Sequence, residues 1–405
     1  MRISTIIASC TLLTISLFTP GCGSAEVAQA PKALKDTAMT NAKIFNAFDY
    51  SDLRATSYLP FVPAQAALIV WPKDSVVSAE ARQPIGFSSV DEKLLVRYSD
   101  YLELRERGNG SLIWGREVHF GVDCQALPNG VLTRNFAGYY QTVTYDSKLI
   151  EGVFLPFLGE RTHLNWVIAD SAETRYAYAS ASVPVHGPTG TPIEAAGVYA
   201  RYRPEDERLL WFFERPGQSR GARLTSDGAT VCLGTYNFID IFPANADSST
   251  KFNSLPVTNL HGVSINHEDK IIAVDDFEDK MRMRCLDLAG KEIWSVFLKT
   301  QGELAQPPVS APGARTWIAV GNTIYHYVEA NLIWEYTIPT AGKIFLTACS
   351  DNSLLVVCGS LFTRLSEHGE AIVNRVFDGK FTCRPLVDNQ GRVFLGGTQG
   401  ILCLR

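Results

Sequence analysis

The chain has 405 residues, with 37 lysines and arginines against 42 acidic residues and a formal net charge of -5. This balance provides no basic footprint for nucleic acid, so we expect no nucleic-acid partner. Apolar residues make up 46% of the sequence and charged residues 20%, which is ample for a full buried core.

Residues 1–22 are typical of an export signal. Arg2 supplies a positive charge, and an apolar run from Ile6 to Phe18 follows it. This run is too short to span a bilayer, as expected of the apolar part of a signal peptide. The sequence therefore predicts an exported protein.

Two cleavage sites compete at the end of this signal. A small residue directly before Cys22 resembles a bacterial lipoprotein signal, although Thr19 and Pro20 depart from its usual pattern. Cleavage after Ala30 is the alternative, but a proline follows that site directly. We predict lipidation at Cys22, which would anchor the protein to a membrane of the bacterial cell envelope.

The cysteines of the body show no pairing pattern. Seven lie beyond the signal, with no Cys-x-x-Cys spacing and no adjacent pair. A disulfide framework or a zinc site would need tighter, paired spacing. We interpret them as small buried apolar residues on strands, at positions 124, 232, 285, 349, 358, 383 and 403.

Residues 23–66 are predicted to be a tether between the lipid anchor and a folded domain. Alanine, serine and lysine dominate its first half, and the second half is more apolar. A helix from Ala33 to Phe48 is the alternative, although the apolar spacing there is irregular.

From Ala67 onward the sequence indicates strands. Runs of four to six β-branched, aromatic or apolar residues alternate with Asp-Gly, Asn-Gly or similar turns, with little helical periodicity. Examples are KLLVRYS, YLELRER, KIIAVDD, TIYHY, SLLVVCG and GILCLR. Such a pattern predicts an all-β sandwich, barrel or propeller.

A recurring phrase decides among these folds. Each copy ends on a large apolar anchor, and most anchors are 39 to 43 residues apart. One gap of 57 contains the Pro- and Gly-rich segment 183–197, which we predict to be an exposed loop. The period near 40 predicts an eight-bladed β-propeller with four-stranded antiparallel blades over residues 67–405. The anchors are Trp71, Trp114, Phe154, Trp211, Phe252, Trp294, Trp334 and Val373.

The anchors and a set of glycines have expected structural roles. Trp114, Trp211, Trp294 and Trp334 are predicted to dock between neighbouring blades rather than to stack on a ligand. Third-strand glycines are expected to adopt a positive φ or to allow close approach of backbones. These glycines are Gly234, Gly321, Gly359 and Gly396.

The phrases LDLAGKEIW, NGSLIW and EANLIW, with GRVFLGGTQGILCL, resemble the PQQ-like (quinoprotein-like) propeller repeat. Two families share that repeat. Quinoprotein dehydrogenases carry an adjacent cysteine pair, an aspartate base and calcium ligands, and this sequence has no adjacent cysteines. The propeller lipoprotein of the outer-membrane β-barrel assembly machinery is similar in length, signal and blade number. The resemblance implies an eight-bladed propeller without a required cofactor.

Two polar clusters are candidate metal sites. His261 and His267 could approach each other around a turn and recruit Glu268 or Asp269, but exposed loop polarity is the better interpretation. The acidic run 275–279 lacks the ligand order of a dedicated calcium loop, so a solvated hairpin turn is favoured. We predict no metal site.

An aromatic cluster offers one further interpretation. Phe136, Tyr139, Tyr140 and Tyr145 could line a groove for a glycan or an extended peptide. Filling of a blade interface is the favoured alternative, since strands of a propeller demand that residue type.

The sequence therefore predicts a non-catalytic propeller that binds or scaffolds protein partners in the cell envelope. No catalytic, cofactor-binding or metal-binding residue is assigned. A quinoprotein-type oxidoreductase and a carbohydrate-binding propeller are the two alternatives.

Overall fold

The computed structural model divides the chain into two compact units, Met1–Met39 and Thr40–Arg405. It describes residues 44–45, 58–64, 69–71, 82–118, 125–127, 130–134, 139–154, 163–169, 177–186, 192–203, 208–217, 219–244, 246, 250–302, 304 and 306–405. All of these lie in the second unit, so the signal and Cys22 lie outside the described residues. Within these ranges the regular structure is entirely β, and no helix suited to crossing a membrane is found.

The first four sheets of the described residues each contain four antiparallel strands that follow one another in the chain. The first sheet holds β4 (Gly86–Val90), β5 (Lys93–Arg97), β6 (Tyr101–Glu106) and β7 (Leu112–Glu117). The second holds β8 (Gln125–Leu127), β9 (Gly130–Arg134), β10 (Tyr139–Thr144) and β11 (Leu149–Phe154). The third holds β12 (His163–Ala169), β13 (Ala177–His186), β14 (Pro192–Arg203) and β15 (Arg208–Pro216). The fourth holds β16 (Ser219–Leu224), β17 (Thr230–Thr235), β18 (Phe238–Pro243) and β19 (Asn253–Pro256).

The remaining sheets of the described residues repeat this plan. The fifth holds β20 (Thr258–Ile265), β21 (Ile271–Phe277), β22 (Lys280–Leu286) and β23 (Glu292–Phe297). The sixth holds β24 (Val309–Ala311), β25 (Arg315–Val320), β26 (Thr323–Val328) and β27 (Asn331–Thr337). The seventh holds β28 (Ile344–Cys349), β29 (Leu354–Cys358), β30 (Leu361–Leu365) and β31 (Ala371–Val376). The eighth holds β32 (Leu386–Val387), β33 (Val393–Gly397), β34 (Gly400–Leu404) and an early strand, β3 (Ile69–Trp71).

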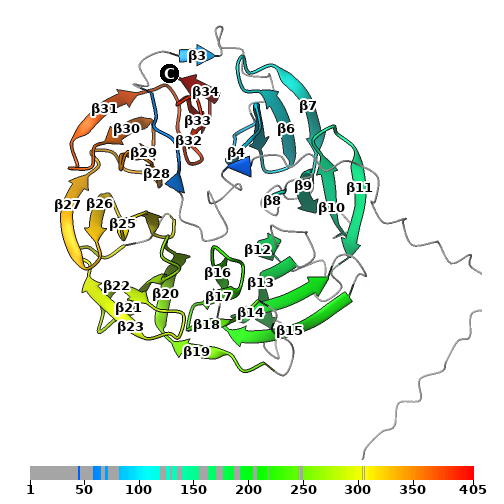
Figure 1. Ribbon diagram of the computed structural model, residues 1–405, viewed down its shortest axis with the longest axis vertical. Coiled ribbons are helices and arrows are strands. Elements are labelled where there is room, and N and C mark those ends of the chain that lie inside the picture. The colour runs from blue at the N-terminus through cyan, green and yellow to red at the C-terminus, as the bar shows by residue number, and fades with distance from the viewer. Residues whose placement is uncertain are drawn as a thin grey trace, which may run out of the picture. The chain divides into compact units, whose positions relative to one another are not determined.

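Each sheet packs against the next, and the last packs against the first (Figure 1). Buried apolar clusters join most neighbouring pairs, and β12 contacts both β8 and β16 at the other two junctions. One cluster unites the seventh, eighth and first sheets through Val357, Phe394 and Phe87. A four-stranded sheet cannot bury both of its faces alone, so this circular packing provides the core.

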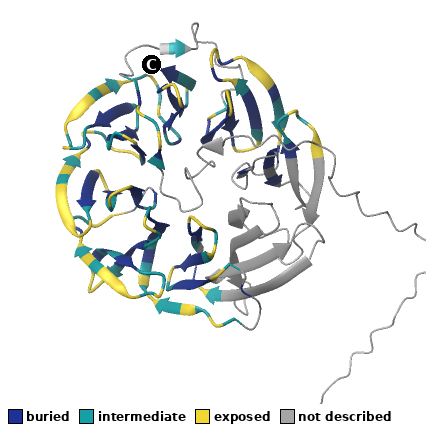
Figure 2. Ribbon diagram, viewed as in Figure 1, coloured by how far each residue is buried: buried dark blue, intermediate teal, exposed yellow. Residues whose placement is uncertain are grey.

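Burial falls from the inside to the outside of those sheets whose burial is described (Figure 2). The second and third strands of the seventh sheet, β29 and β30, are buried throughout. The fourth strands β23, β27 and β31 alternate between exposed and half-buried residues instead. The inner strands β29 and β30 are therefore continuous buried runs, whereas the fourth strands β23, β27 and β31 show the alternation of a surface strand.

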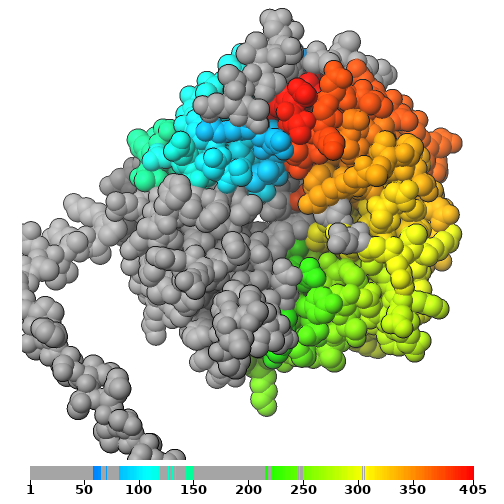
Figure 3. Space-filling view, turned by 180° about the vertical axis from the view of Figure 1, so that it is seen from behind, coloured from blue at the N-terminus to red at the C-terminus, as the bar shows by residue number. Residues whose placement is uncertain are grey.

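The ring is closed by strands from distant parts of the sequence. β3 pairs with β34, so a strand from the first fifth of the chain completes the eighth sheet. In Figure 3 the residues of the first sheet lie beside those of the eighth. The buried Arg107 of the first sheet forms an ion pair with the buried Asp388 of the eighth, with Nε and Oδ2 3.2 Å apart.

The segment expected to be a tether also enters the sheets. β1 (Ile44–Phe45) pairs with β4, and β2 (Tyr58–Leu59) pairs in parallel with β28. The carbonyl oxygen of Pro63 then accepts a hydrogen bond from Arg364, and the amide of Ala64 donates to Gly391. The predicted domain start at residue 67 is therefore too late, and the alternative helix over 33–48 is wrong at Ile44–Phe45.

The four tryptophans of the repeat occupy one structural position. Each lies in the fourth strand of its sheet, opposite the third-strand residue at which a bulge shifts the register. Trp71 and Val373 share this arrangement. The residues at this position in the four repeats are Trp114, Trp211, Trp294 and Trp334.

Three other expectations are corrected by the register. Phe154 lies at the far end of β11, opposite Tyr139 and away from the anchor position. Phe252 precedes β19, and its ring contacts Phe242 of its own sheet, with centroids 4.7 Å apart. The segment 183–197 is largely paired in β13 and β14, so it extends a hairpin rather than forming a loop.

We expect Asp388→Asn to lower the free energy of unfolding by about 3–5 kcal/mol, because it removes the buried carboxylate that Arg107 and Arg392 share. Urea denaturation would measure the change. Glu335→Gln is the matched control, because it removes an exposed pair with Lys299 and should have little effect. Equal losses in the two variants would contradict a special role for the closing ion pair.

Candidate functional site

The strands of each sheet alternate in direction, which sorts the loops onto two faces. The turn between the second and third strands shares a face with the connection to the next sheet. We call this the connector face. The other two turns of each sheet lie on the opposite face, which we call the turn face.

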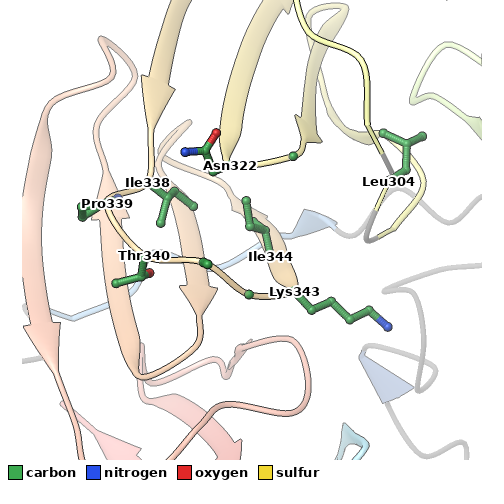
Figure 4. Close-up of a pocket in the computed structure, with 10 residues that line it drawn as sticks. Leu304, Asn322, Ile338, Pro339, Thr340, Lys343 and Ile344 are labelled. Carbon is green, nitrogen blue, oxygen red and sulfur yellow. The ribbon is translucent and has the colours of Figure 1, made fainter.

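The connector face is hollowed between the sixth and seventh sheets. The hollow has a volume of about 910 Å³, within the ~300–1,000 Å³ of typical small-molecule sites. Figure 4 shows it between the β25–β26 turn, which carries Asn322, and the β27–β28 connection, which carries Thr340 and Lys343. Leu304, from the preceding connection, borders it on another side.

Glycines allow the connecting loops to approach the turns closely. Gly342 has a φ of 152°, and a Cβ there would lie 3.1 Å from the amide nitrogen of Gly359. Gly359 itself has a φ of 56°, and Gly321, at the equivalent turn of the sixth sheet, has a φ of 59°. Both glycines, which the sequence placed at the end of a third strand, follow the second strand of their sheets and show the expected positive φ.

The other two glycines of this set lie in the second strands β17 and β33 and show the expected close approach instead. A Cβ on Gly234 would lie 2.8 Å from Leu260, and one on Gly396 would lie 2.8 Å from Phe87. Both contacts cross to the next sheet, so any larger side chain would push neighbouring sheets apart.

The hollow on the connector face is equipped for binding. Among the described residues that line it, Lys343 carries the one charged side chain, and Asn322 and Thr340 add an amide and a hydroxyl. The Thr340 hydroxyl donates to the carbonyl oxygen of Cys358, 3.4 Å away. These lining residues include no carboxylate or imidazole, so they supply no acid–base pair.

The sequence reasoning missed this hollow. Its loop contains Thr340, Gly342 and Lys343 in the string TAGK, and TQGE stands 40 residues earlier at the same place in the sixth sheet. The repeated Thr-x-Gly after the anchor strand is the sequence pattern that could have predicted a connection packed closely against the neighbouring turn.

The two histidines considered for a metal site lie apart. His261 is near the start of β20, and its Nε2 is 2.8 Å from Oδ1 of Asp276. His267 follows the end of that strand, on the turn face, where its ring meets Tyr58 at a centroid distance of 4.7 Å. No group of three or more possible ligands was found among the residues described here.

The acidic run 275–279 divides in two. Glu278 and Asp279 form the turn of a hairpin with φ values of 49° and 60°, as the sequence predicted. Asp275 is fully buried and forms ion pairs with Arg282 and Arg284, at 3.0 and 2.8 Å. That carboxylate is therefore committed to structure rather than to a ligand.

The remaining sequence candidates have structural surroundings or lie outside the described residues. The carbonyl oxygen of Tyr145 accepts a hydrogen bond from the indole of Trp114, and Tyr139 and Tyr140 lie in β10. Phe136 and Cys124 fall outside the described residues. Six cysteines are buried and unpaired, as expected, and burial raises the pKa of the Cys403 thiol to about 12.

One buried histidine stands out in the sixth sheet. The ring of His326 stacks on Trp317 at a centroid distance of 4.6 Å and also contacts Trp334. Neither ring nitrogen has a hydrogen-bond partner among the described residues. Burial, reinforced by the nearby charge of Arg315, lowers the pKa of His326 to about 4.

Comparisons with known proteins agree on the fold. No protein-family model and no curated protein sequence matches the chain. The structure is similar to that of BamB from Moraxella catarrhalis, at 10% identity and a TM-score of 0.50, over 78% of this chain and 93% of that one. It is also similar to quinohemoprotein alcohol dehydrogenase from Comamonas testosteroni, at 10% identity and a TM-score of 0.62, over 89% of this chain and 78% of that one.

Both neighbours have PQQ-like propeller folds, so the chain is an all-β protein with a propeller fold of the quinoprotein-like type. This confirms the resemblance that the repeated phrase indicated. Identities of 10% establish the fold alone.

The described residues do not fit a quinone cofactor held by calcium. The chain has no adjacent cysteine pair, and the described residues contain no cluster of three or more acidic, histidine or cysteine side chains placed to bind a metal ion. No catalytic step through such a group can be derived.

The His326 pocket makes stability depend on pH. The unfolded chain takes up a proton below the ordinary histidine pKa of 6.5, whereas the folded chain resists protonation down to about pH 4. The free energy of unfolding should therefore be highest above pH 6.5 and fall by roughly 3 kcal/mol toward pH 4. Denaturation at a series of pH values should show this slope reduced in His326→Phe.

His368→Gln is the control for this experiment, because His368 is exposed in a turn of the seventh sheet. It should keep the slope. A slope that survives in His326→Phe and disappears in His368→Gln would show that the buried stack is not the titrating element.

Proposed function

We propose that the chain is an exported, lipid-anchored, eight-bladed β-propeller that acts as a non-catalytic module for binding protein partners in the bacterial cell envelope. The observation that carries this proposal is that sheet edges of the ring accept extended segments. β1 and β2 add to inner edges, and β3 adds to an outer edge. A scaffold that binds its own chain by strand addition has the chemistry to bind another chain in the same way.

The eight blades are supported by the eight sheets of the described residues and by the repeat period near 40. Seven of these sheets have their four main strands in chain order, and the eighth is completed by β3. The likeness to BamB covers 93% of that protein, which favours a module of similar extent.

The connector-face hollow is the proposed contact site for a partner. It lies on the face where the sheet-to-sheet connections gather, and its lining offers Lys343, Asn322 and the backbone of glycine-rich loops. Such a surface suits a polar or acidic segment of a protein, which would gain a cation and several amide contacts.

The lipid anchor is supported by the sequence alone. An apolar run from Ile6 to Phe18 precedes Cys22, and the segment that follows continues to the first strands of the propeller. A protein of this kind would act at a membrane surface.

An oxidoreductase of the quinoprotein class is the alternative, favoured by the higher TM-score of 0.62 to the quinohemoprotein alcohol dehydrogenase. The absence of adjacent cysteines in the sequence speaks against it. Neither proposal depends on Trp114 or Trp334, whose indole N–H groups bind carbonyl oxygens of the chain itself.

We expect Ala341→Trp to reduce recovery of a partner when the native protein is purified from detergent extracts. Ala341 is exposed and lines the hollow, so an indole there would fill the space without disturbing the core. Quantitative mass spectrometry of the co-purified proteins would measure the loss. Ala289→Trp is the matched control, because Ala289 is exposed in a β22–β23 turn on the turn face.

Equal recovery with Ala341→Trp and with the unchanged protein would contradict the connector-face contact site. Failure of any partner to co-purify with the unchanged protein would contradict the scaffold. So would tight binding of pyrroloquinoline quinone with calcium, accompanied by dye-linked oxidation of alcohols or sugars, which would favour the oxidoreductase.

We expect Cys22→Ala to move the protein from the membrane fraction to the soluble fraction, because it removes the only thiol at the predicted lipidation site. Fractionation followed by immunoblotting would measure the change. A variant that stays with the membrane would contradict the anchor and leave the binding function standing.

A further inference from the structure

Three junctions between neighbouring sheets share one hydrogen bond. In each, a side-chain N–H on or beside the fourth strand of one sheet donates to a backbone carbonyl oxygen in a turn of the next sheet. The turn in each case is the one between the third and fourth strands, on the turn face. The pairs are Trp114 Nε1 to Tyr145 O at 3.0 Å, Asn253 Nδ2 to Ala289 O, and Trp334 Nε1 to Glu367 O at 2.7 Å.

The covering turns at these junctions have one length. Five residues separate the last paired positions of the two strands, at 144–148, 287–291 and 366–370. The turn then lies directly on the neighbouring strand. A Cβ on Gly369 would be 2.9 Å from the ring of Trp334, and a Cβ on Gly290 would be 2.7 Å from Leu255.

The junction between the fifth and sixth sheets lacks such a turn. Tyr327 and Leu332 are the paired residues that flank this turn, as Leu365 and Ala371 flank the turn in the seventh sheet. They enclose only four residues instead of five. The strands pair as far as Val328 and Asn331, and Glu329 turns the chain with a φ of 52°. The turn whose carbonyl oxygen binds the indole at Trp114 and at Trp334 is therefore one residue shorter at this junction.

A hollow of about 230 Å³ lies beside Trp294 as a result. Its lining includes Trp294 and Ile293 from β23, Lys270 from β21's leading turn, and Glu329 and Asn331 from the short turn. Ile293 is 47% exposed, so the hollow opens to solvent. The indole N–H of Trp294 has no hydrogen-bond acceptor among the described residues, in contrast to those of Trp114 and Trp334.

We propose that this hollow binds a turn of a partner polypeptide, whose main-chain carbonyl accepts the indole N–H of Trp294. The incoming turn takes the place that a turn of the next sheet takes at the other junctions. The volume is below that of a drug-sized site and suits a few backbone atoms with one small side chain. This inference rests on the proposed scaffold function and locates a second contact, on the turn face.

The lining chemistry favours a peptide carbonyl over an apolar group. Lys270 and Asn331 add hydrogen-bond donors at the rim. The hydrogen bond of the indole N–H is strongest when the group that carries the acceptor also excludes water from the hollow. The ring of Trp294 and the side chain of Ile293 then cover the apolar side of the turn.

The test uses a cyclic peptide that carries Ser-Glu-His-Gly-Glu, the turn at 366–370 that covers Trp334. The purified full chain has seven tryptophans, whose indole N–H signals can be followed by 1H–15N spectroscopy. We expect a saturable downfield shift of one indole signal, which Trp294→Phe identifies by removing it. Trp334→Phe is the matched control and should leave the shift intact.

A second variant supplies the turn within the chain. Replacing Val328–Asn331 by Ser-Glu-His-Gly-Glu should shift the Trp294 signal without peptide, abolish the response to peptide and raise the melting temperature. No shift with peptide, or a response that persists after this replacement, would overturn the proposal. So would a response to free N-acetylglycine alone, which would indicate a site for small carboxylates.

The outcome is separable from that of the scaffold proposal. If a partner co-purifies with the native protein and remains bound to the turn-replacement variant, the scaffold stands and the Trp294 site is wrong. If the peptide binds but no partner is recovered, the site stands without the wider function.

Discussion

Mutual burial of neighbouring sheets is the constraint on which this molecule depends. Each sheet leaves apolar faces that only another sheet can cover, so the ring must close or leave a face in water. Closure here combines β3 on β34 with the buried pair of Arg107 and Asp388. A buried ion pair contributes little net stability, but loss of either partner is costly. Such a pair therefore favours the one register of the first and eighth sheets in which both charges meet.

The inner side of the ring is bound together by polar contacts as well. Arg223 Nε donates to the carbonyl oxygen of Val263 on the next inner strand, and Thr347 Oγ1 donates to that of Pro385. Gln306 makes two hydrogen bonds with the backbone of Leu346 in the same way. Inner edges would otherwise present unpaired backbone groups, and the addition of β1 and β2 satisfies more of them.

The repeated phrase predicted most of the fold because one physical role recurs. A large ring at the bulge of the fourth strand contacts the next sheet at Trp114 and at Trp334, so the spacing of such rings reports the spacing of the sheets. The prediction was wrong at Phe154 and Phe252, where other residues carry the junction and residue type alone cannot reveal the register. β1 and β2 were missed because two-residue strands leave no periodicity, and the connector-face hollow was missed because backbone φ at glycine forms it.

Repetition also limits where binding can occur. Residues that recur in every sheet are used to join sheets, as the buried Trp114 shows by bonding to the turn beyond it. A position at which the repeat is broken can leave a donor or an apolar ring without the neighbour that it has elsewhere, and so offer surface to a partner. The short turn at Glu329 is such a break, and it leaves the indole N–H of Trp294 without the carbonyl acceptor that Trp114 and Trp334 have among the described residues.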